Sequence, residues 1–212
     1  MQSLNTRYFK TAVIISLVTA LALFFISLIA GKEQFFLFLN ADAGSIGDYF
    51  FSVFTYSGDG LMWIPVLLIT LFILKRKDVL PLLISAFAVS TMLIQVVKNM
   101  IVPGALRPIK VITDSALIHI VQGVEIHKIS SFPSGHTGTA FCFYLLFCLL
   151  INKRWWLVAG LIYALLVGYS RIYLAQHFPL DVAAGIIVAI ISVTTALRIQ
   201  EYWRRRNVDG QL

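Results

Sequence analysis

The chain has 212 residues, of which 59% are hydrophobic and only 13% are charged. A soluble globular domain carries about 25% charged residues, so this composition excludes an ordinary soluble protein and indicates a polytopic membrane protein. The net charge of +7 does not indicate nucleic-acid binding, because most Lys and Arg residues flank apolar segments, where they set membrane orientation.

Six apolar segments approach the length of about 20 residues that a membrane-spanning helix needs. In chain order we expect spans at residues 11–30, 54–74, 79–97, 135–151, 155–172 and 180–198. The first segment can also be interpreted as a signal peptide, since Ala20-Leu21-Ala22 resembles a cleavage site, but its apolar run continues to Ala30. We therefore expect a single all-α domain over residues 1–212, built as a bundle of six transmembrane helices.

The basic residues predict that both termini are cytoplasmic, because positive charge accumulates on the inner side of a membrane. With the N-terminus inside, eleven of the seventeen Lys and Arg residues are cytoplasmic: Arg7, Lys10, Lys75, Arg76, Lys77, Lys153, Arg154, Arg198, Arg204, Arg205 and Arg206. In a bacterium, six apolar helices imply the cytoplasmic membrane. The long loop from residue 99 to residue 132 then faces the periplasm, and such loops are commonly functional.

The fourth predicted span opens with Pro133-Ser134-Gly135-His136. Proline favours the first turn of a helix, where free backbone N–H groups and the helix dipole attract an anion. Gly135 lets an anion approach the backbone, and His136 has suitable chemistry to give a proton to a leaving oxygen. Alone, the motif is equally consistent with an ordinary helix start and an interfacial histidine.

A second group, Ser170-Arg171, His177 and Asp181, lies between the fifth and sixth predicted spans. Arginine offers a planar set of donors to phosphate oxygens. An aspartate bonded to one imidazole nitrogen leaves the other nitrogen free to attack. The alternative is a helix-start charge at Asp181 and an interface residue at His177. Both groups and Lys98 fall on the outer face in the predicted topology, which favours one shared site.

These two groups resemble the signatures PSGH and SR-x5-H-x3-D of the type-2 phosphatidic acid phosphatase superfamily. The first signature of that family, K-x6-RP, is matched less well, because Lys98 and Arg107-Pro108 enclose eight residues instead of six. The resemblance covers about residues 95–185.

The resemblance implies a membrane lipid phosphatase that forms a phosphohistidine intermediate and uses no metal or other cofactor. By position, His177 is the expected nucleophile, Asp181 its orienting partner and His136 the proton donor. The residues expected to bind the substrate phosphate are Lys98, Arg107, Ser134, Gly135 and Arg171. Polyprenyl diphosphate, phosphatidylglycerol phosphate, phosphatidic acid and lipid A phosphate all suit such a site. The expected partners are the lipid substrate and the bilayer, and the oligomeric state is open.

Two other functions remain open: a lipid phosphotransferase with the same chemistry, and a catalytically silent lipid-binding or transport protein. The haloperoxidases that share the phosphate-site pattern are soluble, so six apolar spans argue against that function. Asp59 is interpreted either as the partner of a site cation or as a turn residue. His119, Glu125 and His127 are interpreted as solvated loop residues rather than metal ligands.

Overall fold

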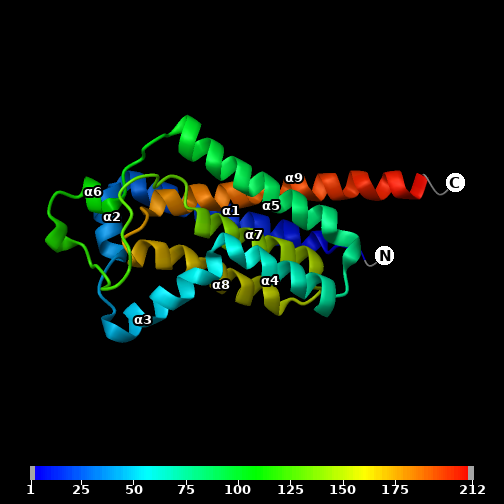
Figure 1. Cartoon of the computed structure of the whole chain (residues 1–212), viewed down its shortest axis with the longest axis horizontal. Helices are drawn as coiled ribbons and strands as arrows, with labels where there is room; N and C mark the ends of the chain where they lie inside the picture. The colour runs from blue at the N-terminus through cyan, green and yellow to red at the C-terminus, as the bar shows by residue number, and fades with distance from the viewer. Residues whose placement is uncertain (1–2, 210–212) are drawn as a thin grey trace.

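The computed structural model describes residues 3–209 as a bundle of helices that contains no strand in this range, with the long helices along one axis (Figure 1). The α-helices are α1 (Thr6–Ile29), α2 (Lys32–Leu39), α3 (Gly44–Phe54), α4 (Trp63–Leu68), α5 (Leu80–Val96), α6 (Pro108–Val111), α7 (Gly135–Leu150), α8 (Trp155–Tyr173) and α9 (Pro179–Asp209). Four short 3₁₀ helices are η1 (Thr55–Gly58), η2 (Gly60–Met62), η4 (Lys77–Val79) and η6 (Ser115–Leu117). Two π-helical turns, η3 (Ile69–Ile73) and η5 (Val97–Ile101), continue α4 and α5. The expectation of an all-α fold is confirmed.

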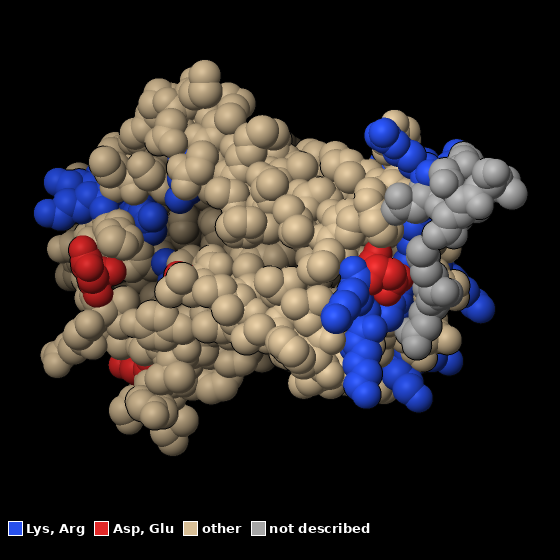
Figure 2. Space-filling model, turned by 45° about the vertical axis from the view of Figure 1, so that its right-hand side comes forward, with Lys and Arg blue, Asp and Glu red and all other residues tan. Residues whose placement is uncertain are grey.

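The two ends of the bundle differ in what they carry. Both chain termini lie at one end, here called the terminal end, and α2, α3 and α6 lie at the other, here called the loop end (Figure 1). In a view turned by 45°, Lys and Arg side chains gather at both ends, with a broad uncharged belt between them (Figure 2). Such a belt is the surface that a lipid bilayer covers.

The helices begin and end at residues with the expected local chemistry. The Asn5 side chain accepts a hydrogen bond from the Tyr8 backbone N–H and caps α1. Gly31 has φ of 82°, a conformation that favours glycine, and it turns the chain from α1 into α2. Pro179 opens α9, where its missing N–H costs no helical hydrogen bond.

Helix α7 forms the centre of the bundle. Every residue from Thr137 to Leu149 is buried, and α1, α5, α8 and α9 pack around the helix. Two glycines allow close approach: Gly138 faces the Gly185 carbonyl oxygen of α9 across a short gap. Small residues permit this kind of packing between membrane helices. The four surrounding helices therefore fix the position of the N-terminal turn of α7.

Four helical segments are long and apolar enough to cross a membrane: Thr6–Ile29, Lys77–Ile101, Trp155–Tyr173 and Pro179–Arg206. A fifth span results if Gly44–Gly58 and Gly60–Ile73, which are bent by 57°, are counted together. The chain is therefore a multi-pass membrane protein. The sixth expected span is α7, whose 16 residues extend about 24 Å against a hydrocarbon core of about 30 Å. Six spans remain a prediction.

Candidate active site

The Pro133-Ser134-Gly135-His136 segment lies at the N-terminus of α7, at the loop end of the bundle. The helix begins at Gly135, so Pro133 precedes the first turn instead of opening it. Ser134 is the N-cap, and its Oγ accepts a hydrogen bond from Thr137 Oγ1 at 2.9 Å. A Cβ placed on Gly135 would meet no atom within 4 Å. The backbone of this turn therefore borders open space, as an anion site at a helix N-terminus requires.

His177 lies in a tight turn between α8 and α9. The backbone N–H groups of Gln176 and His177 both donate to the Arg171 carbonyl oxygen, at 2.9 and 3.1 Å. This turn brings Arg171, in the last turn of α8, next to the start of α9. Asp181 follows in the first turn of α9, and its Oδ2 lies 3.4 Å from His177 Nδ1. Both side chains are buried, with 3% and 7% of their surfaces exposed.

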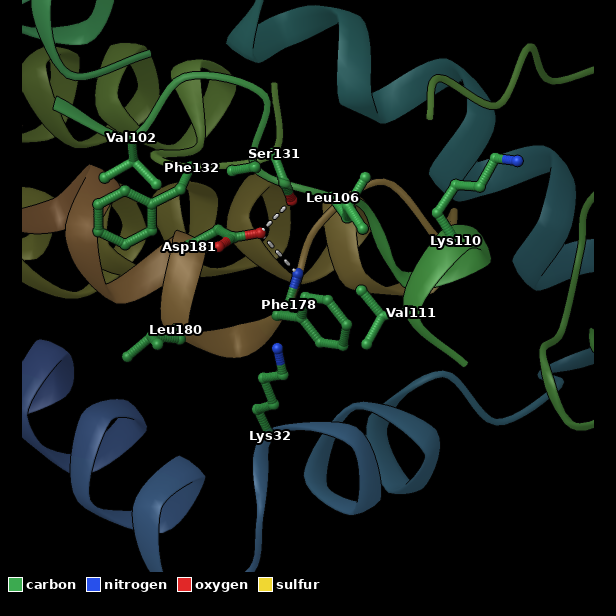
Figure 3. Close-up of a pocket in the computed structure, with 11 residues that line it drawn as sticks. Lys32, Val102, Leu106, Lys110, Val111, Ser131, Phe132, Phe178, Leu180 and Asp181 are labelled. Carbon is green, nitrogen blue, oxygen red and sulfur yellow. Dashed lines mark hydrogen bonds between the residues drawn. The ribbon is translucent and has the colours of Figure 1, made fainter. Parts of the chain in front are cut away.

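The same oxygen of Asp181 has two further partners (Figure 3). Ser131 Oγ donates to Oδ2 at 2.5 Å, and the Phe178 backbone N–H donates to it at 2.9 Å. In addition, the Ser134 N–H donates to the Asp181 carbonyl oxygen at 3.0 Å. The α7 turn, the long loop and the start of α9 are thus joined at Asp181, the first through its backbone carbonyl oxygen and the other two through its carboxylate.

The electrostatics of this site favour an uncharged His177 side chain. Burial lowers the pKa of His177 to about 4, and Arg107 and Arg171 also lower it, while Asp181 acts in the opposite direction. The imidazole is therefore neutral near pH 7. A hydrogen on Nδ1 that points to Asp181 leaves the lone pair on Nε2.

Arg171 is buried and only partly bonded. Its Nη1 donates to Thr55 Oγ1 at 2.7 Å, but its buried Nε has no hydrogen-bond partner among the described residues. An unpaired buried donor on a cation is costly unless an anion meets it. Arg171 is thus a suitable donor to a phosphate oxygen.

Arg107 and Lys98 also belong to this cluster of charges, and they come from the long loop and from the end of α5. Arg107 donates through Nε to the Ile129 carbonyl oxygen and through Nη1 to both oxygens of Gln176, at 2.8 to 2.9 Å. Most of its donors therefore hold the long loop against the turn before His177. Lys98 lies in the π-helical turn η5, a conformation common at functional sites. Its charge acts on those of Arg107, Arg171 and Asp181.

His136 interacts electrostatically with most of the other predicted site residues. Charges from four separate segments of the chain act on it: Lys98, Arg107, Arg171 and His177. His136 also lies beside Asp59, whose Oδ2 is 3.8 Å from His136 Nε2. All eight predicted site residues thus gather at the loop end of the bundle.

Three contributing residues were not predicted: Thr55, Ser131 and Gln176. Asp59 was considered as the partner of a site cation, whereas in the structure it lies beside His136. Ser131 and Gln176 lie within three residues of the motifs, so their position along the chain was a usable signal. Thr55 carries no sequence signal, since its contact with Arg171 spans 116 residues.

His119 is not the solvated loop residue that the sequence suggested. Its Nε2 lies 2.8 Å from Asp48 Oδ1, and its Nδ1 lies 3.8 Å from Asp42 Oδ1. The possible metal-ligand atoms of these three residues lie within 4.8 Å of one another. Asp48 Oδ1 also accepts a 2.6 Å bond from Tyr173 Oη. These contacts attach the long loop to α3 and α8, whereas His127 stays at the surface.

A helical membrane bundle with two histidines beside a cluster of cations is the arrangement expected of an enzyme that acts on phosphate esters in a membrane. Residues 79–205 match the model of the PAP2 superfamily. The chain is 30% identical to lipid A 4'-phosphatase of Bacteroides thetaiotaomicron, over 73% of this chain and 70% of that protein. It is 32% identical to undecaprenyl-diphosphatase of Sulfolobus acidocaldarius, over 60% of this chain and 58% of that protein.

A crystal structure of Aquifex aeolicus LpxE is also similar, with a TM-score of 0.65 and 34% identity, over 77% of this chain and 92% of that chain. The protein belongs to the PAP2 superfamily. It is a lipid phosphatase embedded in a membrane, as the motifs predicted.

Proposed function

We propose that the protein hydrolyses a phosphate monoester or diphosphate of a membrane lipid through a phosphohistidine intermediate, without a metal. His177 Nε2 attacks phosphorus, the bond from phosphorus to the ester oxygen breaks, and His136 gives a proton to that oxygen. Asp181 stabilises the resulting positive charge on His177. Water then attacks the phosphohistidine and gives a proton to His136, which frees phosphate and restores both histidines.

One observation carries this proposal: the Nδ1 of buried His177 lies 3.4 Å from Asp181 Oδ2, and the charges of Arg107 and Arg171 act on the same ring. Lys98, Arg107 and Arg171 supply positive charge where the phosphoryl group transfers, and such electrostatic stabilisation is the largest contribution in many enzymes. The N-terminus of α7, with Ser134 and Gly135, would hold the remaining phosphate oxygens.

A pocket beside Asp181 supports a lipid substrate. It has a volume of about 690 Å³ and lies between Lys32, Lys110 and Asp181 (Figure 3). At Phe132 and Leu180 it adjoins a second, apolar pocket of about 350 Å³ between α1 and α9. We propose that the apolar chains of the substrate lie in this second pocket, which opens toward the bilayer.

We further propose six spans with both termini in the cytoplasm, which places the site at the outer face of the membrane. The terminal end carries the basic turns at residues 75–77 and 153–154. In a bacterium the membrane would be the cytoplasmic membrane and the site would face the periplasm. Among the four lipid classes, lipid A phosphate is the first to test, because the Bacteroides relative is named for it.

The test is phosphate release in detergent with EDTA present, from each of the four lipid classes, by the wild-type protein and by His177→Ala. We expect release that survives EDTA and disappears in the variant. Addition of an acceptor lipid separates hydrolysis from phosphoryl transfer, since only transfer produces a new phospholipid. Release that EDTA abolishes, or that His177→Ala leaves unchanged, would contradict the mechanism.

A further inference from the structure

The bend between η1 and η2 is part of the site although no motif includes it. Here the chain changes direction by 57° between Gly44–Gly58 and Gly60–Ile73. Asp59 occupies the single residue between the two segments. Its Oδ1 accepts a hydrogen bond from the Leu61 backbone N–H at 2.8 Å. Its other oxygen, Oδ2, lies 3.8 Å from His136 Nε2, and the Asp59 side chain is 38% exposed.

The bend packs closely against the backbone and Cβ of His136. A Cβ on Gly58 would lie 3.0 Å from the His136 carbonyl oxygen, 3.3 Å from its Cβ, and 2.4 Å from Val167 Cγ1. Only glycine allows this approach without a shift of the neighbours. At the other end of η1, Thr55 accepts the bond from Arg171. The segment from Thr55 to Gly60 therefore contacts both the proposed proton donor and a proposed phosphate ligand.

Several cations act on His136, and a carboxylate nearby favours its protonated form. Lys98, Arg107 and Arg171 all disfavour a positive charge on the ring, and His177 is the other titratable group that acts on it. Within the part of the chain that the structure describes, Asp59 is the carboxylate at ion-pair distance from His136. A negative charge at about 4 Å favours the protonated imidazole, because opposite charges stabilise each other.

We propose that Asp59 is a positioning residue, which orients the His136 ring and stabilises its protonated form for transfer to the leaving oxygen. This inference rests on the proposed function, in which His136 is the proton donor. In this proposal the proton moves from His136 to the ester oxygen, and a later proton from water restores His136.

The test is Asp59→Asn, compared with wild type on a lipid phosphate and on p-nitrophenyl phosphate. The amide oxygen can still accept the bond from Leu61, so the variant removes the charge and keeps the turn. We expect kcat on the lipid phosphate to fall about 10- to 100-fold, the scale of general-acid catalysis, with KM within about threefold. The loss on p-nitrophenyl phosphate should be under about threefold, because nitrophenolate leaves without a proton.

The pH profile gives the second measurement. The alkaline limb of kcat should move to lower pH in Asp59→Asn, and Asp59→Glu should restore part of both kcat and the limb. Asp42→Asn is the matched control, since this side chain is 65% exposed and lies beside His119. Equal losses on both substrates, or an unmoved limb, would overturn the inference.

A double variant separates this inference from the proposed function. In a His136→Ala protein, adding Asp59→Asn should cause no further loss, because Asp59 acts through the imidazole. An additional loss of about fivefold or more would overturn the inference. If His136→Ala lowers the rate and Asp59→Asn is fully active, the inference about Asp59 is wrong and the proposed function stands. A His136→Ala rate equal to wild type contradicts the proposed function as well.

Discussion

At the residue scale, the carboxylate of Asp181 is held more firmly than its 3.4 Å contact with His177 would suggest. Oδ2 receives shorter bonds from Ser131 Oγ and from the Phe178 N–H. These two donors fix the carboxylate independently of His177. The imidazole is therefore aligned by a group that does not have to move with it, which is how an orienting residue works best.

Removal of one of these donors should weaken catalysis without unfolding the site. We predict that Ser131→Ala lowers kcat about 10-fold, because a hydrogen bond to a charged group contributes about 1.5–3 kcal/mol and only part is lost in the transition state. Steady-state phosphate release measures the effect. Ser45→Ala, at an exposed position in α3, is the control and should leave kcat unchanged. An unaltered Ser131→Ala rate would show that Phe178 alone fixes Asp181.

The lowered pKa of His177 has a consequence for stability with a definite sign. In the unfolded chain the pKa is near 6.5, and in the fold it is about 4. Above pH 6.5 both states are neutral there, so His177 adds no pH dependence. As pH falls from 6.5 toward 4 the unfolded chain binds a proton that the fold excludes, so stability is lost in this window.

We therefore predict that the unfolding temperature in detergent decreases from pH 7 to pH 4.5 and that His177→Asn shows a smaller decrease. A thermal scan of both proteins across this range measures it. Identical decreases in the two proteins would show that other groups cause the acid sensitivity. Turnover should keep its neutral nucleophile down to about pH 5.

At the element scale, long apolar runs predicted the helices well, because a bilayer requires about 20 apolar residues of each span. The sequence did not predict α2, the break at Asp59 or the extension of α9 to Asp209. These depend on tertiary packing, such as the approach of Gly58 to His136, that no local pattern records. The motifs likewise identified the residues expected to touch phosphate, whereas Thr55 and Gln176 act through distant contacts.

The crossing of α7 and α9 gives a sharp test of how closely the site is packed. A Cβ on Gly185 would lie 2.6 Å from the Ser134 carbonyl oxygen and 3.0 Å from Thr137 Cβ. Alanine is the better helix former by about 1 kcal/mol, so any loss must come from crowding. We predict that Gly185→Ala lowers both kcat, by about 10-fold or more, and the unfolding temperature.

Enzyme assays and thermal scans of purified protein measure these changes. Gly60→Ala is the matched control, because a Cβ there meets no atom within 4 Å. If Gly185→Ala were as active and stable as Gly60→Ala, the start of α7 would have more freedom than the packing indicates.

At the scale of the whole molecule, the pockets predict how chain length affects the reaction. Leu180 lies where the pocket beside Asp181 adjoins the apolar pocket between α1 and α9. Leu180→Trp should narrow this junction and raise KM about fivefold or more for a long-chain lipid phosphate, since a bulky side chain displaces bound chain. KM for a short-chain analogue should change little.

Ile191→Trp is the control, because this side chain is 47% exposed on the same helix and lines neither pocket. Equal effects of Leu180→Trp on both substrates would place the lipid chains elsewhere.

The orientation of the bundle can be measured with single cysteines. Lys128 lies in the long loop and Lys153 in the turn before α8, and both are exposed. The native Cys142 and Cys148 are buried and provide no reactive background. We predict that an impermeant maleimide labels Lys128→Cys in intact cells, and labels Lys153→Cys only after the membrane is opened. The reverse pattern would invert the proposed topology.

The central position of α7 also affects which positions of the chain tolerate substitution during evolution. Side chains on the outer face of α1, such as Ile14 and Val18, are 63% and 60% exposed, so many apolar residues would serve there. A change in α7 needs a matching change on four neighbouring helices. Substitutions should therefore accumulate in α1 and remain rare in α7. The family match begins at residue 79 and therefore does not include α1.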